Sequence, residues 1–250
     1  MIFFIWWLFP PFFTIPRSEM VWGVFYQLVA LFGGVCGLNI VYSWKGENHL
    51  LRRAVFAFSV GLLLQNLGQT LFSVYIIVWH IPVPYPSLPD IGYFGSIPFY
   101  IYGVMQLMRG SGIVDVMKTP VEKFQMGTVL LVMYVLSYRF FLHGYHIDLA
   151  HPFKLFFDLG YPLGQATYVG LALILWIFSK NIKDSAVFAQ LQLFLVALVV
   201  QYFADFNFLF QVNRGAWIAH GFGDMLYLSA YFLMCIAILH FDRIVEIKNK

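Results

Sequence analysis

Long apolar runs constrain this sequence most, because a helix needs about 20 apolar residues to cross the hydrocarbon core of a bilayer. Seven such runs follow one another along the chain. They cover residues 20–44, 53–79, 92–109, 125–143, 153–179, 186–211 and 221–241. Only 11% of the residues are charged, against about 25% in an average soluble domain. The sequence therefore predicts an all-α polytopic membrane protein, a seven-transmembrane-helix bundle.

The positions of the cationic residues predict how this bundle is inserted. Eleven of the fifteen Lys and Arg residues lie on the loops that follow predicted helices 1, 3, 5 and 7. The other four are Arg17, Arg139, Lys154 and Arg214. Since cytoplasmic loops carry the excess of Lys and Arg, we expect the N-terminus outside and the C-terminus in the cytoplasm. A multi-pass protein of the plasma (inner) membrane follows, with the lipid bilayer as its partner and no nucleic acid.

Three regions are expected along the chain. Residues 1–18 are rich in Trp and Phe and are interrupted by Pro10 and Pro11, which break a helix. We interpret them as an interfacial N-terminal segment. Residues 19–243 form the seven-helix transmembrane domain, and residues 244–250 form a cytoplasmic tail.

Two aspartates near the C-terminus, Asp205 and Asp224, lie within apolar sequence. Asp224 falls at the predicted start of helix 7, where the helix dipole favours a negative charge. Asp205 falls near the predicted C-terminal end of helix 6, where the dipole opposes it. An ionisable group at that depth is costly and needs a partner, a proton or water. We therefore expect Asp205 to face the bundle interior, near Arg139, a tyrosine or water.

Other polar groups recur at helical spacing at the same depth. They predict an outward-opening pocket between helices 2, 5, 6 and 7, and hydrogen bonding between helices is the other interpretation. The candidate ligand-binding residues are Asp205, Asp224, Asp158, Tyr161, Gln165, Gln201, Tyr227, Gln69 and Arg139. No catalytic motif and no metal-ligand spacing is recognisable, and the sequence does not identify a cofactor.

A D-x-x-Y pattern occurs three times, beginning at Asp90, Asp158 and Asp224. Each is expected in the first turn of a helix that runs inward. Either helix-start chemistry or a duplicated two-helix hairpin would produce this pattern.

Gly33 and Gly37 form a small-xxx-small pair on predicted helix 1. Such a pair permits close approach of another helix. It predicts packing within the bundle or a homodimer seam.

Three stretches carry a resemblance to a known family. "PYPSLPDIGYFGSIPFYIYGV", "DLGYPLGQATYVGLALIL" and "YFADFNFLFQVNRGAWIAHGFGDMLYLSAYFLM" resemble motifs of bacterial seven-helix membrane sensor regions. Those regions typically precede a diguanylate cyclase, a phosphodiesterase or a histidine kinase. The match covers about residues 80–110 and 155–240. The shared residues are Pro86, Ser87, Asp90, Pro162, Gly164, Asp205 and Asp224.

The resemblance implies a sensor, with two departures from the family pattern. Gln165 stands where the family often has an acid, and the printed sequence ends at "HFDRIVEIKNK", so we expect the effector to be a separate protein. We therefore expect a membrane sensor or receptor-like module that binds a small or membrane-phase ligand and signals to a cytoplasmic partner. A small-solute transporter or channel is the alternative, and no enzymatic reaction can be assigned.

Overall fold

The computed structural model describes residues 5, 7–8, 18–44, 48–116, 119–179, 185–213 and 221–248. Helices account for nearly all of these residues, and no strand occurs among them. The α-helices are α2 (Ser18–Phe25), α3 (Leu28–Tyr42), α4 (His49–Ser73), α5 (Leu88–Gly110), α6 (Ile113–Val116), α7 (Pro120–Ser137), α8 (Pro152–Ser179), α9 (Ser185–Asn213) and α10 (Phe222–Lys248). Two π-helices, η2 (Val74–Val78) and η3 (Tyr138–Leu142), extend α4 and α7.

Six helical segments within the described ranges are long and apolar enough to cross a membrane. They are Val21–Tyr42, His49–Val78, Pro120–Leu142, Pro152–Ser179, Leu191–Gln211 and Phe222–Phe241. The all-α prediction is confirmed, and each predicted apolar run contains a helix. The helix at the third run, α5, is not among the six spans. It carries Asp90, Ser96 and Gln106, which are buried against neighbouring helices and lower its hydropathy.

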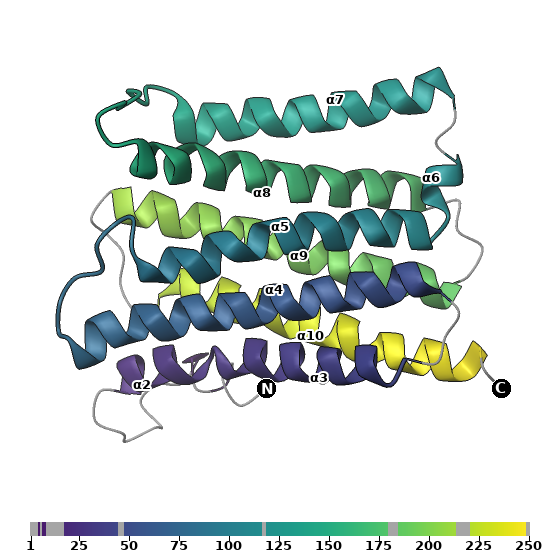
Figure 1. Cartoon of the computed structure of the whole chain (residues 1–250), viewed down its shortest axis with the longest axis horizontal. Coiled ribbons are helices and arrows are strands. Elements are labelled where there is room, and N and C mark those ends of the chain that lie inside the picture. The colour runs from purple at the N-terminus through teal and green to yellow at the C-terminus, as the bar shows by residue number, and fades with distance from the viewer. Residues whose placement is uncertain are drawn as a thin grey trace.

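Six helices close into a ring in which each packs on the next. The order around the ring is α3, α4, α5, α8, α9 and α10, and α10 returns to α3. The last long helix, α7, lies outside the ring against α8 (Figure 1). Met133 and Ser137 are the buried residues of α7, so most of this helix is left for lipid. Side chains that point inward from the ring can meet at its centre.

Local sequence explains where several helices begin. Ser87 and Asp90 form a capping box at the start of α5, with the Ser87 N–H donating to Asp90 Oδ2 at 2.7 Å. Thr119 and Glu122 form the same motif at α7. Asn48 caps α4 by accepting from two backbone N–H groups. The helix-start interpretation of Asp90 is thus confirmed.

The glycine pair of α3 packs inside the chain. A Cβ on Gly33 would lie 3.0 Å from Leu62 Cδ1 on α4 and 3.1 Å from Cys235 Cβ on α10. A Cβ on Gly37 would collide with Ser59 Oγ of α4. The pair therefore lets α3 approach α4 and α10, and a homodimer seam at this pair would require α3 to leave both.

Both ends of the chain fall partly outside the described residues. Of the predicted interfacial segment 1–18, the structure describes Ile5, Trp7, Leu8 and the backbone of Ser18. At the other end α10 continues to Lys248. The last predicted helix, 221–241, therefore ends seven residues later than expected.

Candidate functional site

The carboxylate of Asp205 is the centre of a polar network inside the ring. Its Oδ1 accepts from Tyr227 Oη at 2.8 Å and from Gln201 Nε2 at 3.3 Å. Its Oδ2 accepts from Gln165 Nε2 at 2.9 Å and from Tyr168 Oη at 3.4 Å. These donors come from α8, α9 and α10, so one carboxylate connects three helices. The prediction that Asp205 faces the interior is confirmed.

Helical spacing on α8 and α9 explains why these donors converge. Gln165 and Tyr168 are three residues apart and therefore share one face of α8. Gln201 lies one turn before Asp205 on α9, so it reaches the same carboxylate. Hydrogen bonds to an ionised group contribute about 1.5–3 kcal/mol each. Several are needed here, because burying a carboxylate costs several kilocalories per mole.

A second chain of hydrogen bonds joins α10 to α4 and α5. Tyr231 Oη donates to Gln65 Oε1 at 3.1 Å, and Gln65 Nε2 donates to Ser96 Oγ at 2.8 Å. On the adjacent turns, Tyr93 Oη donates to Gln69 Oε1 at 2.6 Å. Gln69 is therefore part of the polar interior, although its contacts are with α5 rather than with Asp205.

A cavity of about 10 Å³ lies between these two groups of bonds. Residues of α4, α5, α8 and α9 line it, among them Tyr100, Gln165 and Asp205. This volume is about the space that one water molecule needs. Two lining atoms, Tyr100 Oη and Gln165 Oε1, have no hydrogen-bond partner in the described part of the chain.

The structure places Asp158 apart from Asp205. Because α8 begins at Pro152, Asp158 lies in its second turn, and the expectation of a helix-start position is wrong for this residue. Proline is favourable at the first helical position, which explains the earlier start. Asp158 Oδ2 accepts from Tyr145 Oη at 2.6 Å and lies 3.9 Å from Lys154 Nζ.

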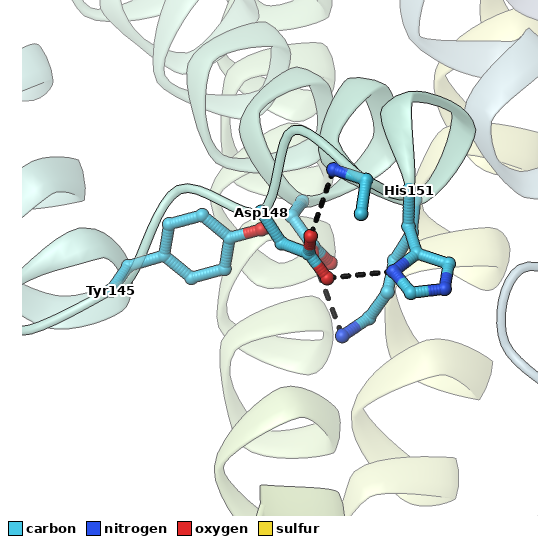
Figure 2. Close-up of polar contacts among 6 residues, drawn as sticks. Tyr145, Asp148 and His151 are labelled. Carbon is cyan, nitrogen blue, oxygen red and sulfur yellow. Dashed lines mark hydrogen bonds and ion pairs between the residues drawn. The ribbon is translucent and has the colours of Figure 1, made fainter.

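The segment before α8 contains a small polar cluster (Figure 2). Asp148 accepts from the Ala150 N–H at 3.0 Å and lies 2.7 Å from His151 Nδ1. This hydrogen bond to His151, followed by the one from Ala150, lowers the pKa of Asp148. The hydrogen bond to Asp158 raises the pKa of Tyr145 to about 12. Burial, followed by the charge of Asp158, raises the pKa of Tyr85 in the loop before α5.

The remaining predicted residues have different positions. Tyr161 lines the cavity and donates to Asp90 Oδ1 at 2.7 Å. Asp224 lies in the first turn of α10, as expected. Arg139 lies on η3 with its side chain exposed. Asp205 has no ion pair among the described residues, so the expected proximity of Arg139 is not realised as an ion pair.

Sequence reasoning missed the contribution of α5. The expected pocket involved helices 2, 5, 6 and 7, yet Tyr93, Ser96 and Tyr100 of α5 all line the cavity. Their spacing of three and four residues places them on one helix face. That spacing was a usable signal, but the lower hydropathy of α5 and its two prolines obscured it.

The fold and this site define an all-helical protein with six candidate membrane spans and a buried polar centre. Comparison of the chain with protein-family models, curated proteins and solved structures finds no match. The function must therefore be argued from the residues of the site.

Proposed function

We propose that this protein is a membrane sensor or receptor-like module. A small or membrane-phase ligand acts on the Asp205 network, and the signal leaves through α10 toward a cytoplasmic partner. One observation carries the proposal: the Asp205 carboxylate holds side chains of α8 and α10 at the same time. A change at this carboxylate therefore changes how α10 is held against α8 and α9.

The length of α10 supports this route for the signal. The helix has 27 residues, which corresponds to about 40 Å at 1.5 Å per residue. Tyr227 lies near its start and Lys248 is its last residue. A shift at Tyr227 is thereby transmitted along a continuous helix to the other end of the bundle.

The proposal includes seven crossings of a bacterial plasma membrane, with the N-terminus outside. The distribution of Lys and Arg supports this orientation, and α5 packs between α4 and α8 as a seventh crossing helix would. We expect a cysteine at Ser111 to react with an impermeant reagent only from the cytoplasmic side. A cysteine at His146 should react only from outside, and the reverse pattern would contradict the orientation.

Transport remains the competing function. A cavity of about 10 Å³ has no room for a solute larger than water, so transport requires the ring to open. Asp205-dependent solute flux into proteoliposomes would show that the protein is a transporter or channel and would contradict the sensor proposal.

Cys235 offers a native reporter for the movement of α10. Its side chain is 5% exposed and lies against Gly33 of α3. In a Cys36→Ser background, we expect Asp205→Asn to change the rate at which Cys235 reacts with a membrane-permeant maleimide. Asp158→Asn, a carboxylate on α8 that does not contact the network, is the matched control. Equal rates in the two variants and the parent would contradict the proposal.

A further inference from the structure

Two oxygen atoms beside Asp205 have unused hydrogen-bonding capacity. Tyr100 and Gln165 line the cavity and are 1% and 3% exposed. Neither Tyr100 Oη nor Gln165 Oε1 has a partner among the described residues. Buried polar atoms are almost always satisfied in folded proteins, so these two indicate a species bound between them.

The hydrogen bonds around Asp205 are those of an anion. A deprotonated carboxylate offers about four acceptor positions, and four donors occupy them. A protonated carboxyl would have one acceptor position fewer and would have to donate to a tyrosine hydroxyl, Tyr227 Oη or Tyr168 Oη, in place of accepting from it. Within the described ranges no cationic side chain pairs with Asp205. An ionised Asp205 would therefore be stabilised by these hydrogen bonds alone among the described residues, and a bound cation would add the opposite charge.

The orientation of the neighbouring glutamines leaves two oxygen atoms without a hydrogen-bond partner among the described residues. Gln165 and Gln201 both direct Nε2 toward Asp205. Their Oε1 atoms are consequently left as acceptors, and both are buried without a partner in the described part of the chain. Carboxylate and amide oxygens are the ligands that hard cations prefer. Turning either amide would bring its oxygen against an oxygen of Asp205, which is unfavourable when Asp205 is ionised.

Size and charge narrow the class of ligand. A cavity of about 10 Å³ excludes organic cations, and magnesium usually retains several waters. One carboxylate balances one positive charge. We propose that the Asp205 cavity binds one small monovalent metal cation, with sodium as the probe, held by Gln165 Oε1 and Tyr100 Oη beside the charge of Asp205. This rests on the proposed function, because it names the ligand class of the same site.

Sodium-dependent thermal stability tests the proposal. The purified protein in zwitterionic-lipid nanodiscs is melted in sodium chloride or choline chloride at equal total concentration, at neutral and acidic pH. We expect a saturable rise in Tm with sodium. Asp205→Asn should abolish the rise, and Asp158→Asn should retain it.

Tyr100→Phe keeps the test decisive if Asp205→Asn does not fold. The change removes one hydroxyl that has no hydrogen-bond partner among the described residues, so it should raise Tm in choline chloride. It should also weaken the apparent sodium affinity by roughly tenfold, as loss of a supporting group at a metal site does.

Three results would overturn the cation site. Equal Tm values in sodium and choline chloride would indicate that the cavity holds a water molecule and not a cation. A Tm that follows pH but not sodium would indicate a proton on Asp205. A sodium effect that persists unchanged in Asp205→Asn would place the cation elsewhere.

The two proposals fail separately. Sodium-dependent stability without a change in the reaction rate of Cys235 would support the cation site and contradict the sensor proposal. A change in the reaction rate of Cys235 without sodium-dependent stability would support the sensor proposal and contradict the cation site.

Discussion

Replacing Tyr227 by phenylalanine removes one hydroxyl and leaves the ring in place. That hydroxyl donates to Asp205 Oδ1 at 2.8 Å, across the contact between α10 and α9. A hydrogen bond to an ionised group contributes about 1.5–3 kcal/mol, whereas neutral bonds between membrane helices average about 0.6 kcal/mol. We therefore expect Tyr227→Phe to lower the free energy of unfolding by about 1.5–3 kcal/mol.

Two further variants calibrate this value. Tyr168→Phe removes a donor to the same carboxylate at 3.4 Å, a distance at which the bond is weak, and should cost less than about 1 kcal/mol. Ser137→Ala removes a buried neutral bond to the Pro162 carbonyl and should cost about 0.6 kcal/mol. Unfolding in mixed micelles with increasing dodecyl sulfate measures all three. A cost for Tyr227→Phe no larger than that for Ser137→Ala would refute the view of Asp205 as a buried anion.

Two other parts of the structure give independent predictions. A Cβ on Gly92 would collide with the Gly68 backbone of α4, whereas one on Gly127 meets nothing within 4 Å. Gly92→Ala should therefore destabilise the protein by about 1–3 kcal/mol, and Gly127→Ala should stabilise it by up to about 1 kcal/mol. Chemical unfolding of the two variants measures both changes. The stability from the bond of Tyr145 to Asp158 is fully present below the ordinary tyrosine pKa of about 10 and is lost as pH rises through about 12. Difference absorbance against Tyr145→Phe should give that midpoint, and Asp158→Asn should return it toward about 10; an unchanged midpoint would contradict the bond.

Much of the helical pattern was predictable because a bilayer imposes simple rules. Apolar length located each long helix, and the unfavourable position of Asp205 near a helix C-terminus correctly marked it as needing partners. The sharing of a face by Gln201 and Asp205 followed from helical spacing alone.

The order in which helices pack was not predictable, because it depends on side-chain fit between distant segments. The closed ring places α5 beside α8 and leaves α7 outside, and the neighbours of a helix do not follow from its own sequence. Asp158 illustrates the same limit. Its helix begins six residues earlier than the D-x-x-Y pattern suggested, so Asp158 meets Tyr145 instead of Asp205.

The central claim is that the Asp205 carboxylate controls the position of α10. Spin labels at Phe56 of α4 and Leu239 of α10, both exposed, report this position in nanodiscs once Cys36 and Cys235 are replaced. We predict that Asp205→Asn shifts the distribution of distances between the labels, while Asp158→Asn leaves it as in the parent. The same distribution in all three proteins, each shown to be folded, would contradict the account.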